Sequence, residues 1–248
     1  MELPFDLTIA QSVYMAVALV VAAIIRGLSG FGFSAIFILS TALITNPLPL
    51  IPVVFSCEIA MTLFQARGIK GHIDWKRVRF LMLGSAVAIV PSVAIMARLS
   101  ADEARLAISV LILCLSGLLL SGWSLKTEVG GRGTFFAGVA SGMVNSAGVG
   151  GLVIAAFFAS QPMAAMVFRA TMIVFLTGLD IISLPVMGAH GLIGPETVTG
   201  VILAFPLLGL GVWLGTLGFN RVPQSAFRRM VIIMLTAFSI LNVAKIIL

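Results

Sequence analysis

Two glycine-rich stretches inside apolar sequence are expected points of interruption in a helix, and both carry short polar side chains. The first runs from Arg26 to Ser34, and the second runs from Asn145 to Gly151. Glycine favours a helix break, and the N–H groups and dipole at a half-helix N-terminus attract negative charge. The pattern predicts a site for a small oxyanion such as a sulfonate, sulfite or carboxylate. Its predicted contacts are Arg26, Ser29, Gly30, Phe31, Gly32, Phe33, Ser34, Asn145, Ser146, Gly148, Gly150, Gly151 and Arg169.

These stretches also have a purely structural interpretation, in which small residues let membrane helices pack closely. Matched breaks in both halves favour a substrate site, because a membrane tolerates irregular backbone only where it is buried in protein or lines a cavity. Phe31 and Phe33 are in addition candidates for a gate beside the first break.

Four polar side chains form a second candidate set, for ion coupling or for lining a cavity. Glu58, Thr62 and Gln65 have the spacing i, i+4 and i+7, which places them on one helical face. Asp180 is the fourth member. Because a charge inside a bilayer is costly, Glu58 is a candidate proton acceptor. The alternative is a buried carboxylate that a partner such as Arg26 neutralises.

Arg169 has two interpretations that the sequence leaves open. Three helical turns, or roughly 16 Å, separate it from Asp180, so these two residues cannot form an ion pair. Its charge suits recruitment of an anion. A long side chain near the end of a span can equally extend to the membrane surface.

The composition is that of an integral membrane protein. Hydrophobic residues make up 60% of the chain, charged residues make up 10%, and the mean hydropathy is +1.18. Soluble domains carry about 25% charged residues. The 248 residues allow about six to eight spans, and the basic residues lie mainly in short loops, which argues against nucleic-acid binding. Cys57 and Cys114 are predicted to be buried thiols, and no metal or other cofactor is expected.

Two apolar segments are too short to cross a bilayer alone. Segments 133–146 and 148–160 are therefore predicted to form the two arms of a re-entrant hairpin. Segment 30–46 is similar, although segment 9–28 before it is long enough to span. A final apolar segment covers 227–247, and kinks are expected inside spans at Pro91, Pro185 and Pro206.

The two halves resemble each other in the order of their landmarks. Asn46-Pro47 follows the first glycine stretch, and Gln161-Pro162 follows the second. Chance similarity of apolar sequence is the alternative, but the shared order favours duplication. We predict a first transmembrane repeat over 1–125 and a second over 126–248, each with a broken segment and about three spans.

Loop charges predict that the repeats have opposite orientations. The loop at 67–79 is rich in Lys and Arg and should face the cytoplasm, whereas its counterpart at 188–196 carries only His190 and Glu196 and should face outward. Arg98 is the exception, because this scheme places it outside. The same scheme places Glu2 and Asp6 on the outer side of the membrane. It places the following residues on the inner side: Lys126, Arg132, Arg221, Arg228 and Arg229.

Three other classes of protein compete with a transporter. A passive anion channel would use the same site, and a structural membrane subunit would bind no anion. An intramembrane serine protease is suggested by the Gly-x-Ser-Gly pattern ending at Gly30, with His190 as the base. A nucleophile needs its base within hydrogen-bond reach, and His190 is expected in an outward loop.

With both glycine stretches in view, the chain resembles the TauE/SafE family of sulfite and organosulfonate exporters. The likeness rests on the sequence from Arg26 to Gly32, Asn46-Pro47, the element from His72 to Trp75, and the second glycine cluster with Gln161-Pro162. Phe33 stands where many members have small residues, and the second cluster lacks a proline that often follows it.

The resemblance implies a multi-pass transporter of the cell inner membrane, an exporter of small sulfur-containing or carboxylate anions. The glycine motifs would lie near the substrate, and access would alternate between the two sides. Its partners would be the anion and the lipid bilayer, with no nucleic acid, and a homodimer is left open.

Overall fold

The computed structural model describes residues 7–121, 125 and 127–218, together with the single residues 233, 236, 237, 240 and 244. All regular structure in these ranges is helical, in the order α1 (Ile9–Ser29), α2 (Phe33–Ala42), η2 (Leu48–Leu50), α3 (Ile51–Ile69), α4 (Trp75–Met96), α5 (Ala101–Leu120), α6 (Gly131–Asn145), α7 (Gly150–Ala159), α8 (Ala165–Ala189) and α9 (Pro195–Gly218). Six of the charges used to predict the orientation lie outside the described residues: Glu2, Asp6, Lys126, Arg221, Arg228 and Arg229. So does most of the predicted final segment 227–247.

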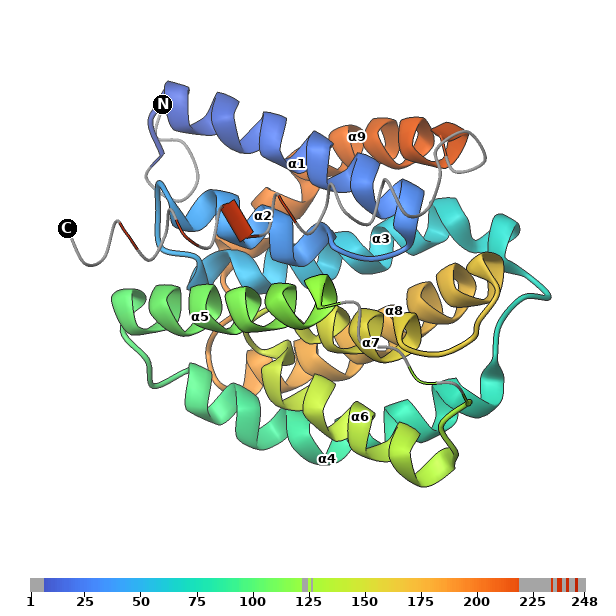
Figure 1. The fold of residues 1–248 in the computed structure, drawn as a ribbon. Coiled ribbons are helices and arrows are strands. Elements are labelled where there is room, and N and C mark those ends of the chain that lie inside the picture. The colour runs from blue at the N-terminus through green and yellow to red at the C-terminus, as the bar shows by residue number, and fades with distance from the viewer. Residues whose placement is uncertain are drawn as a thin grey trace.

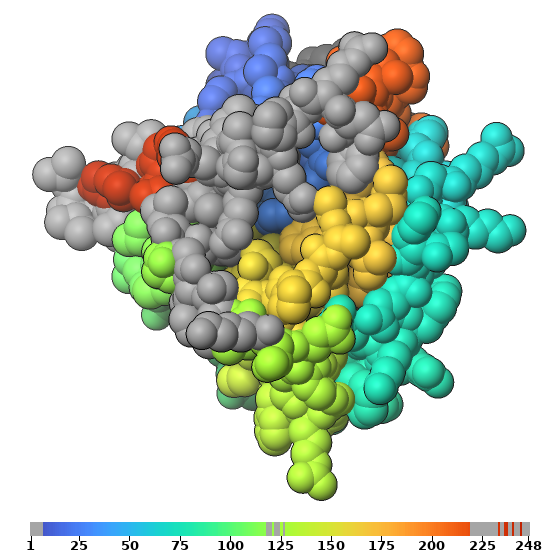
Figure 2. Space-filling view, turned by 45° about the vertical axis from the view of Figure 1, so that its right-hand side comes forward, coloured from blue at the N-terminus to red at the C-terminus, as the bar shows by residue number. Residues whose placement is uncertain are grey.

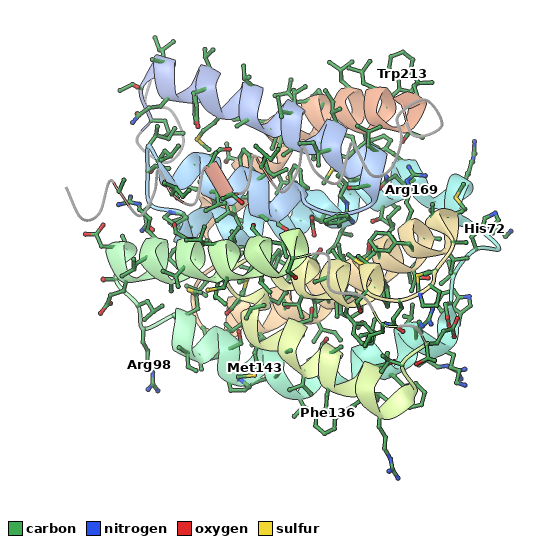
Figure 3. The ribbon with its side chains drawn as sticks, in the orientation of Figure 1. His72, Arg98, Phe136, Met143, Arg169 and Trp213 are labelled. Carbon is green, nitrogen blue, oxygen red and sulfur yellow. The ribbon has the colours of Figure 1, made fainter. Side chains whose placement is uncertain are left out.

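Five of the described helical segments are long and apolar enough to cross a membrane. They are Ile9–Ser29, Leu48–Ile69, Trp75–Met96, Ala165–Ala189 and Pro195–Gly218. Large apolar side chains cover the outside of the molecule, and Figure 3 shows Trp213 on one side with Phe136 and Met143 on the opposite side. Such a surface suits lipid rather than water. The prediction of an all-α multi-pass membrane protein is confirmed.

Two helix pairs form opposite sides of the molecule, α1 with α9 and α4 with α6 (Figure 1). In the first pair, a Cβ atom at Gly211 would lie 2.6 Å from Cβ of Ala23, and one at Gly215 would lie 2.8 Å from Cα of Gly27. Both numbers rise together, so the two helices run parallel. Gly27 was predicted to belong to the first break, but α1 continues through it and uses it for close packing against α9.

The pair α4 and α6 packs in the same manner. A Cβ atom at Gly138 would lie 2.8 Å from Cα of Leu81, and one at Gly142 would lie 2.7 Å from the carbonyl oxygen of Ser85. These helices are also parallel. Small residues thus bring backbones into contact on both sides of the molecule, as is common between membrane helices.

Helices α3 and α8 pack between these pairs and run antiparallel. The hydroxyl groups of Thr62 and Thr177 are 2.6 Å apart, and beyond the end of α3 the N–H of Asp74 donates to the hydroxyl of Thr171 at 3.0 Å. Residue numbers therefore increase along α3 in the direction in which they decrease along α8.

The first short helix returns along the helix before it. Helix α1 ends at Ser29, Gly30 and Gly32 have φ of +81° and +89°, and α2 then begins. These left-handed conformations favour glycine. The hydroxyl of Tyr14, near the start of α1, donates to the carbonyl of Ser40 at 3.2 Å, near the end of α2.

The second short helix returns in the same way. Helix α6 ends at Asn145, Gly148 has φ of +72°, and α7 begins at Gly150. Just before α6, the N–H of Val129 donates at 2.8 Å to the side-chain oxygen of Gln161, just after α7. We call α1–α2 the first hairpin and α6–α7 the second hairpin.

The loops on either side of α4 lie at opposite ends of the molecule. Figure 3 shows His72, before α4, at one end and Arg98, after α4, at the other. Figure 2 shows the α3–α4 region in teal, with side chains that project from one edge of the molecule. The exposed cations of this region are Arg67, Lys70, Lys76 and Arg79. The three predicted kink residues, Pro91, Pro185 and Pro206, lie inside α4, α8 and α9.

Candidate functional site

Arg26 lies fully buried in the last turns of α1, with 0% of its surface exposed. Its Nη1 donates to Oε1 of Glu58 at 3.3 Å and to the carbonyl of Gly30 at 3.3 Å. Its Nε and Nη2 are buried and have no hydrogen-bond partner among the described residues. A guanidinium presents donors in a planar fork, so these two groups can bind two oxygens of one carboxylate or sulfonate.

Two buried carboxyl groups lie on α3 and α8, the helices that contact the end of α1 beside this arginine. Glu58 on α3 is 2% exposed, and Asp180 on α8 is 1% exposed. Thr62, one turn after Glu58, contacts Thr177, three residues before Asp180, so the two acids lie on facing turns of α3 and α8. Oδ2 of Asp180 is buried and has no hydrogen-bond partner among the described residues. Arg26 and Glu58 form the ion pair that the sequence offered as an alternative to a free proton acceptor.

The predicted polar face of α3 points toward α1 and α8. The side-chain amide of Gln65 approaches the carbonyl of Arg26 at 3.5 Å, while Thr62 contacts Thr177 on α8. Oε1 of Gln65 is buried without a donor in the part of the chain described. Glu58, Thr62 and Gln65 thus line the contact between helices from both halves of the chain.

Arg169 near the start of α8 points inward, with 4% of its surface exposed. Its Nη2 donates to the carbonyl of Gly27 at 2.7 Å and lies 3.4 Å from the hydroxyl of Thr216 on α9. It therefore does not extend to the membrane surface, which was one of the two interpretations of the sequence. Its contacts tie α8 to the end of α1, next to Gly30.

The side chains of the first break are mostly occupied by local structure. The hydroxyl of Ser29 lies 2.7 Å from the carbonyl of Phe31 and 2.9 Å from that of Ile25, and it accepts from the N–H of Phe31 at 3.1 Å. Phe31 packs edge-to-face on Phe168, which packs in turn on Phe158. Phe33 stacks on Phe37, one turn further along α2.

The second break is held by neutral hydrogen bonds. The amide of Asn145 donates to the hydroxyl of Ser183 on α8 at 3.0 Å, and the hydroxyl of Ser146 meets that of Ser92 on α4. Gly150 and Gly151, predicted as part of the break, form the first turn of α7.

The two breaks approach each other through α2. A Cβ atom at Gly148 would lie 3.8 Å from Cβ of Ser34, which is itself buried in the first turn of α2. Gly151 lies against Leu176 of α8. The predicted residues therefore form one connected region, but the charged groups gather around Arg26.

Three hydroxyl residues that form hydrogen bonds in this region were not predicted from the sequence. Thr177, Ser183 and Thr216 are ordinary hydroxyl residues within apolar helices, and only their contacts reveal a role. Cys57 is buried as predicted, but Cys114 is exposed on α5, because an apolar side chain of a membrane protein can face lipid. Among the described residues no group of three metal-ligating side chains occurs.

Comparison with known families agrees with this architecture. The family model described as Sulfite exporter TauE/SafE matches residues 14–241, nearly the whole chain. Comparison with curated proteins and with solved structures finds no match. A family of membrane transporters fits a chain that has five candidate spans and a fully buried arginine. On a match of this length, the chain belongs to the sulfite exporter TauE/SafE family.

Proposed function

We propose that this protein carries a small sulfite-, sulfonate- or carboxylate-type anion across the membrane and that Arg26 binds it. The family's name supports the substrate class and export as the direction. The observation that carries the proposal is the buried guanidinium, whose Nε and Nη2 have no partner among the described residues. A buried donor without a hydrogen bond costs free energy, and an oxyanion would accept hydrogen bonds from these two groups.

The neighbouring residues would complete the site. Ser34, Gly148 and the backbone of the two breaks lie on the same connected region, and Arg169 adds positive charge beside Gly30. Phe31 and Phe168 pack at the end of the first hairpin, where they would separate the site from one side. We place the anion between Arg26 and the breaks.

We further propose that the halves are inverted repeats. The order of a hairpin followed by long helices occurs twice, and the equivalent helices α3 and α8 run antiparallel. The pair α1 and α9 corresponds to the pair α6 and α4 when the halves are exchanged. An inverted pair of this kind supports alternating access by movement of one half against the other. The basic α3–α4 loop would face the cytoplasm of a bacterial-type inner membrane.

Transport distinguishes this proposal from a passive channel. Purified protein in liposomes should exchange labelled sulfite for internal unlabelled sulfite and accumulate the label transiently above its equilibrium level. Arg26→Gln should abolish this counterflow, and Arg98→Gln, at an exposed cation, should leave it unchanged. Equilibration without transient accumulation would indicate a channel. Normal counterflow by Arg26→Gln would remove Arg26 from the site.

A further inference from the structure

We propose that Glu58 and Asp180 together form one proton-binding site, which takes up a proton when an anion binds to Arg26. This inference rests on the proposed anion site at Arg26 and specifies how that site is coupled. Glu58 belongs to the first half and Asp180 to the second, so the proton would lie at the contact between the halves.

The geometry of the two acids already requires a proton. Oδ2 of Asp180 is buried without a donor among the described residues, and an ionised carboxylate in such surroundings is strongly unfavourable, so this acid is protonated. Glu58 accepts from Arg26 at 3.3 Å and is therefore the charged member, so Asp180 holds the proton. With Arg26 positive, Glu58 negative and Asp180 neutral, the buried cluster has no net charge.

Other charged or titratable groups around the pair do not alter this balance. The thiol of Cys57 is buried beside Glu58 on α3, and a thiol is neutral in such surroundings. Arg169 lies on α8 and donates to the carbonyl of Gly27. Helix α9 contributes the hydroxyl of Thr216.

An anion that takes Arg26 from Glu58 upsets the balance. The arginine and a monovalent anion then neutralise each other, and Glu58 is left as an unpaired buried carboxylate. Such a charge is strongly unfavourable, so Glu58 binds one proton from water. The guanidinium–Glu58 contact breaks, the guanidinium–anion contact forms, and release of the anion returns the proton. The anion and the proton would therefore cross the membrane in the same direction.

Calorimetry tests this linkage directly. Ethanesulfonate is a suitable probe because its sulfonate stays ionised across the accessible pH range. Titration in buffers of different ionisation enthalpy counts the protons taken up per anion bound. We expect close to one proton for the wild-type protein, and an affinity that falls about tenfold for each pH unit above the titration of the pair.

Variants locate the proton. The double variant Glu58→Gln with Asp180→Asn should bind ethanesulfonate without proton uptake and with no pH dependence, whereas the exposed Glu196→Gln should behave as the wild type. If the double variant does not fold, the number of protons taken up by the wild-type protein still tests the inference. Asp180→Asn alone replaces one neutral group with another, so uptake of one proton by Glu58 should persist.

Each outcome separates the inference from the proposed function. Binding that requires Arg26 but takes up no proton would overturn the inference and leave the anion site intact. Uptake of one proton by the double variant would place the proton elsewhere. Failure of any anion to bind the wild-type protein would overturn the proposed function itself. In liposomes, an outward sulfonate gradient should carry protons outward, and inward proton flow would contradict the shared direction.

Discussion

The two hairpins share a backbone plan and differ in charge. In each, a glycine with positive φ follows the longer helix, and a short helix then returns. The last turns of the longer helices donate to the helix after the hairpin, through Arg26 to Glu58 in the first and Asn145 to Ser183 in the second. A neutral hydrogen bond therefore suffices to hold the fold at this place.

The charged pair of the first hairpin consequently needs another explanation. A buried ion pair is often no more stabilising than neutral or apolar residues in its place, because both charges lose their hydration. Arg26 also has donors that the described protein does not satisfy. Under the proposed function, this difference gives Arg26 the main contact with the anion and gives the second hairpin a supporting role.

The largest effect on stability should come from the charged pair. Glu58→Gln leaves Arg26 as an uncompensated buried cation, which should lower the free energy of unfolding by about 3 kcal/mol. Thermal unfolding in detergent measures the loss, and saturating ethanesulfonate should restore part of it. An unchanged melting temperature would mean that the pair does not compensate the charge of Arg26.

Glycine substitution should destabilise both breaks but weaken anion binding mainly at the first. Gly30→Ala and Gly148→Ala place a side chain at positive φ, which costs about 1–2 kcal/mol. A Cβ atom at Gly30 would also lie 3.0 Å from Cγ of Arg169, next to the charged region. We expect both variants to lower the melting temperature, with the larger loss of sulfonate binding for Gly30→Ala. Weaker binding for Gly148→Ala alone would reverse the assignment.

The neutral pair should contribute less than the charged pair. Ser183→Ala removes the acceptor for the Asn145 amide, which should cost about 1 kcal/mol and leave sulfonate affinity unchanged. Unfolding and calorimetry on the same preparation check both parts. A loss as large as that of Glu58→Gln would show that the two hairpins do not differ in this respect.

The smallest effect is expected at Ser29. Its hydroxyl closes the turn at the first break, so Ser29→Ala should cost less than about 1 kcal/mol and preserve counterflow. A serine-directed fluorophosphonate probe should not label the wild-type protein. Labelling that disappears in Ser29→Ala would instead favour the intramembrane protease.

The sequence predicted the burial of the charged residues better than their contacts. Burial of Arg26 and Glu58 and their pairing follow from the high cost of charge within a membrane. The positions of Glu58 and Asp180 on facing turns did not follow, because they depend on how α3 and α8 pack across the two halves. Gly27 was assigned to the break because composition cannot distinguish a glycine that ends a helix from one that lets helices approach.

The most direct test of the central claim is ethanesulfonate binding to Arg26→Gln, measured by calorimetry beside the wild type and Arg98→Gln. The account predicts saturable binding by the wild type and by Arg98→Gln, and at least a hundredfold loss, or about 2.7 kcal/mol, in Arg26→Gln because the charged donor is gone. Wild-type affinity in a folded Arg26→Gln protein would contradict the account.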